Sequence, residues 1–141
     1  MIKIILILFV LNNTLNSNDI IRKNNIIKDL NTNLMWQDNN NSELKRNWKN
    51  AVNYCQELKL GKYDNWRLPS KDEFLKTIDN LRYNPNLKEN IFKNISSDGY
   101  WSSTNHITRD DYACVLYFDY AYTYCNDKNN SYYVRCVRDI K

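Results

Sequence analysis

The stretch Asp64-Asn-Trp-Arg-Leu-Pro-Ser-Lys-Asp-Glu73 decides how this chain folds. Ser70 and Glu73 have the spacing of a capping box, in which each side chain hydrogen-bonds the backbone N–H of the other residue at the start of a helix. Pro69 lies just outside this cap, and Phe74 at the fourth helical position can fold back over it. The stretch is therefore predicted to form a corner between two helices.

The helix before the corner is predicted over residues 48–60. Asn47 can cap its first turn, and Gly61 can supply the left-handed residue that ends it. Its apolar residues recur at helical spacing on one face: Trp48, Ala51, Val52, Cys55 and Leu58.

The helix after the corner is predicted to end before Asn84-Pro85, because a residue that precedes proline disfavours helical geometry. Four apolar side chains should point inward from it: Phe74, Leu75, Ile78 and Leu81.

The remaining elements are predicted to be strands. Ile26-Ile27 and Leu34-Met-Trp36 form a predicted hairpin, and the polar residues 18–25 before it are expected to be loose and flexible. After Asp98-Gly99 the chain changes to strand patterns, which we expect over 100–104, 113–118, 122–125 and 132–138. This order predicts an α+β fold whose last strand pairs with the N-terminal hairpin and brings the N- and C-terminal strands together.

Length and charge limit the function classes. A chain of 141 residues with a net charge of +4 is one domain, and its basic residues are spread along the sequence. A solvated surface is therefore expected and a nucleic-acid partner is not.

The N-terminus is predicted to be a signal peptide over residues 1–17. Lys3 precedes an apolar run that ends at Leu11 and is too short to span a bilayer, with cleavage expected near Ser17. An uncleaved anchor or a buried strand is the alternative. After cleavage, no integral membrane span would remain. The protein would be exported, either to the periplasm or to the cell surface and medium, and its four cysteines should then be paired. Four cysteines allow three pairings.

Five motifs in this order resemble those of one bacterial family, the Lcl C-terminal domain family, named for a domain of a collagen-like adhesin. They are Leu34-Met-Trp-Gln37, Trp48-x-x-Ala51 with Tyr54-Cys55, Leu60 to Ser70, Tyr100-Trp-Ser-Ser-Thr104 and Tyr133-Val-Arg-Cys-Val-Arg138. The resemblance implies a domain over residues 26–141 with a C-type-lectin-like fold, related to the formylglycine-generating-enzyme fold.

The resemblance also implies roles for individual residues. Cys55 and Cys136 resemble the long disulfide of the lectin-like fold, whereas Cys114 and Cys125 flank a tight hairpin and can face each other across it. Ala121 stands where family members often carry Gly. The family's structural positions are matched by Trp36, Trp48, Trp66, Arg67, Pro69, Trp101, Arg135 and Arg138.

Catalytic and metal-binding residues are not apparent from the sequence, and no cofactor is expected. His106 is the only histidine, the cysteine spacing does not suit zinc, and no nucleophile–base pair can be named. Asn84-Pro-Asn86 is similar to a sugar-binding motif of lectins, but it directly follows a helix and is interpreted as a helix stop.

Tyrosines near the C-terminus are the remaining functional signal. Cross-strand pairing explains many of them, but aromatic rings also bind sugars and protein partners. The candidate ligand face comprises Arg109, Tyr117, Tyr120, Tyr122, Tyr124 and Lys128. The sequence thus favours a non-catalytic, adhesin-like binding module for a glycan or protein ligand. A structural or interaction domain of the cell envelope is the second interpretation, and an enzyme related to the formylglycine-generating group is the third.

Two segments match an extended bacterial acceptor pattern for N-glycosylation. They place the acceptors at Asn40 and Asn129. Because the chain is rich in Asn, chance matches of this kind are expected.

Overall fold

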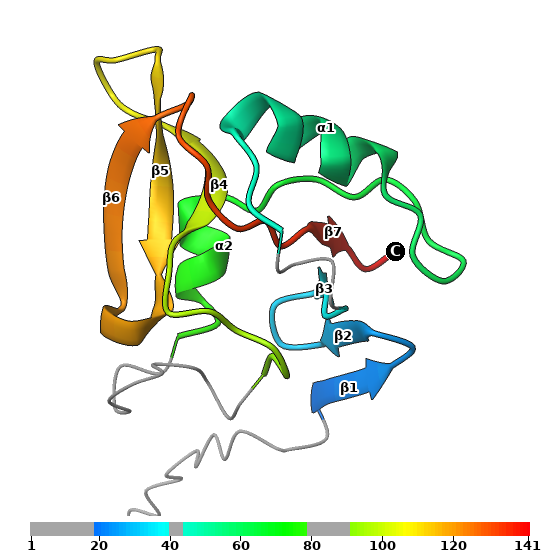
Figure 1. Cartoon of the computed structure of the whole chain (residues 1–141). Coiled ribbons are helices and arrows are strands. Elements are labelled where there is room, and N and C mark those ends of the chain that lie inside the picture. Colours follow the sequence, from blue (N-terminus) through cyan, green and yellow to red (C-terminus); the bar gives the residue numbers. More distant parts are fainter. Residues whose placement is uncertain (1–18, 40–43, 79–90) are drawn as a thin grey trace, which may run out of the picture.

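The computed structural model describes residues 19–39, 44–78 and 91–141. The elements form two small antiparallel sheets and two helices (Figure 1), which confirms the predicted α+β class. In chain order they are β1 (Ile20–Lys23), β2 (Ile26–Asp29), β3 (Leu34–Gln37), α1 (Trp48–Glu57), α2 (Lys71–Leu75), β4 (Tyr100–Asn105), β5 (Tyr112–Tyr117), the 3-10 helix η4 (Phe118–Tyr120), β6 (Tyr122–Asp127) and β7 (Val137–Asp139).

The first sheet has the strand order β1-β2-β3-β7. It contains the predicted hairpin of β2 and β3. It also pairs β3 with the C-terminal β7, which confirms the prediction that the last strand pairs with the N-terminal hairpin. The prediction of a loose segment over residues 18–25 is wrong for Ile20–Lys23, which pairs with β2. Asn24 and Asn25 both have positive φ, which is the requirement of a tight two-residue hairpin turn.

Helix α1 begins as predicted and ends earlier. The Asn47 side chain accepts a hydrogen bond from the Asn50 N–H at 2.9 Å and caps the first turn. The helix ends at Glu57 rather than at residue 60, because Leu58 is already extended. Gly61 therefore does not end the helix. It occupies the left-handed conformation within a separate turn.

Helix α2 has the predicted capping box and is a single short turn. The Ser70 side chain accepts from the Glu73 N–H, and the Glu73 carboxylate accepts from the Ser70 N–H at 2.8 Å. Phe74 and Ile78 are buried as predicted, but Leu75 is exposed, so its inward assignment is wrong. Leu81 and the Asn84-Pro-Asn86 motif lie outside the described residues, as do the signal-peptide residues and Asn40.

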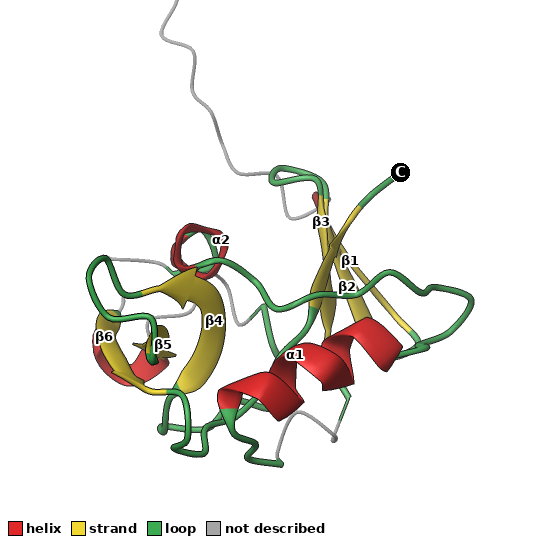
Figure 2. Ribbon diagram, turned by 90° about the horizontal axis from the view of Figure 1, so that it is seen from above, coloured by secondary structure: helices red, strands yellow, loops and turns green. Residues whose placement is uncertain are grey.

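The second sheet has the order β4-β5-β6, and the C-terminal segment connects it to the first sheet. The prediction of one strand over 132–138 is wrong, because the segment changes partners along its length. Tyr132 pairs with Arg46, Tyr133 pairs with Tyr100, and Val137 then enters β7. Figure 2 shows α1 lying across the space between the two sheets.

Two apolar clusters share the strands of both sheets. On β3, Trp36 enters one cluster and its neighbour Met35 enters the other; on β5, Leu116 and Val115 divide in the same way. Since successive side chains of a strand point to opposite faces, each sheet has one face in each cluster. Phe74 of α2 belongs to the first cluster and Cys55 of α1 to the second.

In the part of the chain that the structure describes, neither helix has the length and apolar character needed to cross a membrane.

Candidate functional site

Four tyrosines gather at the turn end of the β5–β6 hairpin, and we call them the tyrosine face: Tyr117, Tyr120, Tyr122 and Tyr124. Tyr122 and Tyr124 are two residues apart on β6 and so point to the same side. Their rings are stacked, with centroids 6.3 Å apart and an interplanar angle of 14°. Tyr117 on β5 is the cross-strand partner of Tyr122, and these rings lie 6.1 Å apart.

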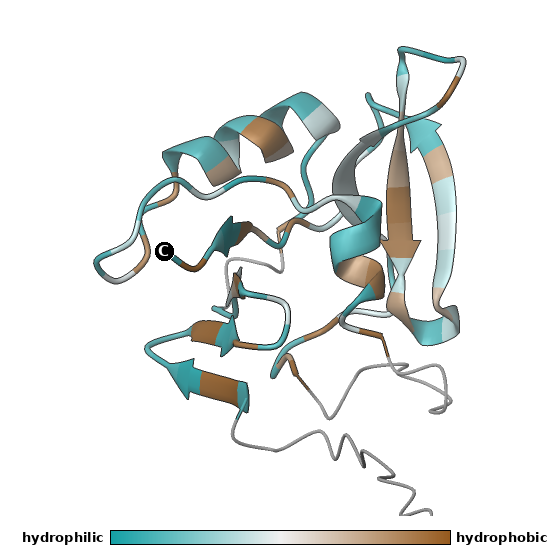
Figure 3. Cartoon of the chain, turned by 180° about the vertical axis from the view of Figure 1, so that it is seen from behind, coloured by the Kyte–Doolittle hydropathy of each residue, from teal (hydrophilic) through white to brown (hydrophobic). Residues whose placement is uncertain are grey.

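The tyrosine face is exposed and encloses a shallow hollow of about 300 Å³. Tyr120 is 71 % exposed, Tyr122 52 % and Tyr124 54 %. Figure 1 shows β6 at the outer edge of the molecule, and Figure 3 shows that apolar residues concentrate on β5 instead. The exposed tyrosines therefore do not serve the core, unlike the buried Tyr100.

Tyr117 is the half-buried floor of this hollow. Burial raises the pKa of its hydroxyl well above the usual range, and a hydrogen bond with Tyr132 acts in the same direction. Its hydroxyl is therefore neutral at physiological pH and can donate or accept a hydrogen bond.

Arg109 and Lys128 do not join the tyrosine face. The β5–β6 ladder runs from the pair Tyr117–Tyr122 at one end to Tyr112–Asp127 at the other. Five residues of strand separate these ends by roughly 17 Å. Both cations lie beyond the second end, where Arg109 pairs with Asp111 and Lys128 donates to the Asp110 carbonyl. Their inclusion in one ligand face with the tyrosines is therefore wrong.

The family's tryptophans are structural. Trp36 and Trp101 are fully buried and Trp66 is 2 % exposed. The Trp101 indole donates to the Arg46 carbonyl, and the half-buried Trp48 indole donates to the Ser102 carbonyl, both at 2.9 Å. They hold the strands and helices together.

Arg67 fixes the corner between the helices. Its guanidinium donates to both carboxylate oxygens of Glu73, at 2.8 and 2.7 Å, and to Asp139 of β7 at 3.1 Å. Burial alone would raise the pKa of Glu73, but the Arg67 hydrogen bonds and charge and the Ser70 N–H together lower this pKa below its usual range. Arg67 thus binds a carboxylate at a partly exposed site.

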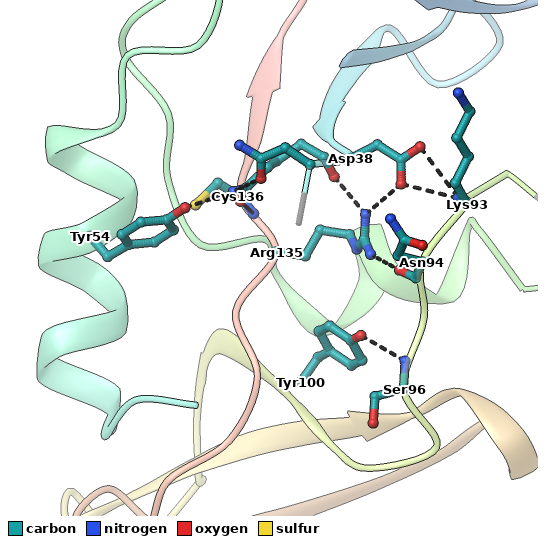
Figure 4. Close-up of polar contacts among 10 residues, drawn as sticks. Asp38, Tyr54, Lys93, Asn94, Ser96, Tyr100, Arg135 and Cys136 are labelled. Atoms are coloured by element: carbon teal, nitrogen blue, oxygen red, sulfur yellow. Dashed lines mark hydrogen bonds and ion pairs between the residues drawn. The ribbon is translucent and has the colours of Figure 1, made fainter. Parts of the chain in front are cut away.

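Arg135 is the centre of a buried polar network (Figure 4). Its guanidinium is fully buried and donates to the Asp38 carboxylate at 3.0 Å and to the Gln37 carbonyl at 2.7 Å. It also donates to the Asn94 carbonyl. The same Asp38 carboxylate accepts from the Lys93 N–H, so the network joins three segments of the chain. Arg135 thus links backbone segments inside the fold, and Asp38 is the partner that the sequence did not reveal.

Gln37 extends this network toward α1. Its amide donates to the Tyr54 hydroxyl at 2.7 Å, and its carbonyl oxygen accepts from the Cys136 N–H at 3.1 Å. Arg138 likewise donates to a backbone carbonyl, that of Asp64, at 2.8 Å. Gln37 and Arg138 thus hold backbone segments of the fold in place.

Both cysteine pairs lie at bonding distance, as predicted. Cys55 of α1 meets Cys136 in the C-terminal segment, and Cys114 of β5 is the cross-strand partner of Cys125 on β6. No cysteine of the chain remains free.

His106 lies in the connection between β4 and β5. Its ring packs against Tyr112, and its Nδ1 accepts from the Thr108 N–H at 3.2 Å. Within residues 19–39, 44–78 and 91–141, no three His, Cys, Asp or Glu side chains converge as metal ligands.

Comparison with known proteins identifies the family. The Lcl C-terminal domain matches residues 25–138, which include both helices, the second sheet, strands β2 and β3 and the whole Arg135 network. The chain belongs to the Lcl C-terminal domain family. No curated protein matches the chain. The five sequence motifs that resembled this family are the ones that form the buried framework, while the tyrosine face lies outside those motifs.

Proposed function

We propose that this Lcl C-terminal domain protein is an exported, non-catalytic binding module whose tyrosine face binds a glycan. The observation that carries the proposal is the stacked, exposed pair Tyr122 and Tyr124 beside a hollow that, among the described residues, is lined by tyrosines alone. Exposed aromatic clusters on soluble domains mark interaction sites more often than isolated apolar residues do. Tyrosine offers a flat apolar ring for the C–H face of a sugar and a hydroxyl for its polar rim.

Export and the lack of catalysis are parts of the same proposal. Two disulfides suit an oxidising compartment, in keeping with the signal-like sequence of residues 1–17. An enzyme related to the formylglycine-generating group would need a reactive cysteine, and here both pairs are at bonding distance.

The experiment is a glycan-array screen of the whole protein followed by affinity measurements on variants. We expect saturable binding of at least one glycan class, and a loss of about tenfold in affinity for Tyr122→Ala or Tyr124→Ala, since a central aromatic contact contributes about 1–2 kcal/mol. Ile107→Ala is the control, because Ile107 is 98 % exposed and lies in the β4–β5 connection.

Two results would contradict the glycan ligand. One is the absence of saturable binding on the array. The other is equal loss of binding in the Ile107 variant. Binding of a protein partner that is lost only in the tyrosine variants would assign the same face to a protein ligand instead.

The second candidate, an interaction domain of the cell envelope with no small ligand, is favoured by one feature of the fold. Strand β6 is the outer strand of its sheet, so one side of its backbone is unpaired in the described part of the chain. Such an edge can add a strand from another chain. Retention of envelope partners by the Tyr122 and Tyr124 variants would favour this candidate over the tyrosine face.

A further inference from the structure

A second hollow lies on the first sheet, far in sequence from the tyrosine face. It forms where two reverse turns meet: the Asn24-Asn25 turn between β1 and β2, and the turn in which Leu60 and Tyr63 exchange backbone hydrogen bonds of 3.1 Å. The second turn approaches the start of β2, because a Cβ on Gly61 would lie 3.5 Å from Ile26 Cδ1. The hollow measures about 510 Å³, which is within the range of small-ligand sites.

The charged side chains at this hollow are all cationic. Lys23, Lys28 and Lys62 line it together with Tyr63. The Nζ atoms of Lys28 and Lys62 lie 5.4 and 5.7 Å from the centroid of the Tyr63 ring. The guanidinium carbon of Arg138 lies 4.9 Å from the same centroid. Three positive charges thus surround one ring and Lys23 lines the same hollow, in a chain whose whole net charge is +4.

These cations lack carboxylate partners among the described residues. The ion pairs there involve Lys45, Arg67, Arg109 and Arg135 instead. Arg138 donates to the carbonyls of Asp64 and Asp139 and not to their carboxylates. A π-face attracts a cation without neutralising it, so the site keeps its positive charge.

We propose that this hollow, which we call the lysine pocket, binds a phosphate monoester. Three lysine ammonium groups can each donate to one terminal oxygen, and a phosphate monoester presents three such oxygens with a charge of about −1.5 to −2. A carboxylate offers only two oxygens and one charge. Ile21, which is 46 % exposed at the rim of the pocket, provides an apolar contact for the organic part of the ester.

Tyr63 provides a spectroscopic reporter for this site. A hydrogen bond from Lys28 lowers the pKa of the Tyr63 phenol, more than burial raises it, and the charges of Lys62 and Arg138 add to the lowering. An anion bound to these cations should move that pKa back toward its ordinary value.

The test is a titration of the whole chain at constant ionic strength with glucose 6-phosphate, monitored by calorimetry and by the NMR signals of Tyr63. We expect saturable binding that shifts the Tyr63 ring signals. Lys28→Gln and Lys62→Gln should each weaken the affinity by about five- to tenfold, the loss of one charge-assisted hydrogen bond. Lys49→Gln is the matched control, because it removes the same charge from the exposed face of α1.

Three results would overturn the proposal. They are the absence of saturable binding, equal weakening by Lys49→Gln, and equal affinity for glucose 6-sulfate, which carries a single charge. Lys62 lies in an exposed turn, so its variant keeps the test valid if Lys28→Gln fails to fold.

A phosphate monoester can come from a soluble ester or from a lipid. Vesicles containing phosphatidic acid form a second arm of the experiment. Vesicle binding that glucose 6-phosphate displaces assigns the pocket to a lipid headgroup, whereas binding of the sugar phosphate alone assigns it to a soluble ester. The proposal is independent of the tyrosine face, and Tyr122→Ala should leave phosphate binding unchanged.

Discussion

At the scale of single residues, the fold depends on one buried charge. Arg135 is 0 % exposed, packs against the Phe92 ring with its guanidinium carbon 4.1 Å from the centroid, and pairs with Asp38. Burying a charge is expensive unless it is paired and hydrogen-bonded. The two terminal nitrogens of Arg135 also donate to the carbonyls of Gln37 and Asn94, so the arginine fixes two backbone segments as well.

Removing the charge of Asp38 should therefore destabilise the protein strongly. We expect Asp38→Asn to lower the free energy of unfolding by about 3–5 kcal/mol, because the Arg135 charge would remain buried without its counter-ion. Urea unfolding at neutral pH measures this change. The exposed Asp110→Asn is the control, with an expected change below about 0.5 kcal/mol. A loss of less than 1 kcal/mol for Asp38→Asn would show that water or another group compensates the arginine.

At the scale of elements, the sequence predicts best where the signal is local. The capping box of Ser70 and Glu73 was foreseen because the two residues interact across three positions. The end of α1 was not, because Leu58 leaves the helix toward the turn that Leu60 and Tyr63 form. Strand β1 was missed because, in Ile20–Lys23, only its first residue is partly buried and the rest are exposed, so apolar alternation is absent.

The turn after η4 contains a local conflict between residue and backbone. Ala121 has φ 50° and ψ 37°, a left-handed conformation that costs a non-glycine residue about 1–2 kcal/mol. The family resemblance led us to expect Gly at this position, and Ala121 adopts the left-handed conformation that favours Gly.

Ala121→Gly should consequently stabilise the protein. The relief of left-handed strain exceeds the added entropy of glycine in the unfolded chain, and we expect a gain of about 0.5–1 kcal/mol, measured by urea unfolding. The matched control is Ala51→Gly in the middle of α1, which should destabilise the protein by 1 kcal/mol or more. If both variants lose stability to the same extent, Ala121 is not strained in solution.

At the scale of the whole molecule, the C-terminal segment joins everything else. Within eight residues it pairs with Arg46, Tyr100 and Arg67, then with β3. The sequence predicted the last of these pairings but read the segment as one regular strand. The composition of residues 132–138 is typical of a strand. The segment pairs with residues of both sheets, and this depends on where the sheets lie, which the composition does not indicate.

The arrangement of the whole molecule also explains which parts of the candidate site the sequence predicts. The convergence of Tyr117, Tyr122 and Tyr124 follows from a tight hairpin, which sequence reasoning can place. Arg109 and Lys128 are close to these tyrosines in sequence, but they lie at the other end of the ladder. The lysine pocket was invisible, because Lys28 and Lys62 are brought together by two turns that are distant in sequence.

The two disulfides should contribute unequally to stability. Cys55 and Cys136 are 81 residues apart, and their bond ties α1 to the C-terminal segment; Cys114 and Cys125 are 11 apart within one hairpin. The loop-entropy model assigns about 4.5 kcal/mol to the first bond and about 3 kcal/mol to the second. We therefore expect the double variant Cys55→Ala/Cys136→Ala to lose more stability in urea than Cys114→Ala/Cys125→Ala, with each compared to the parent under non-reducing conditions. The local hairpin variant controls for the loss of a buried sulfur pair as such. A larger loss for the hairpin variant would contradict the view that closure between α1 and the C-terminal segment stabilises the whole domain.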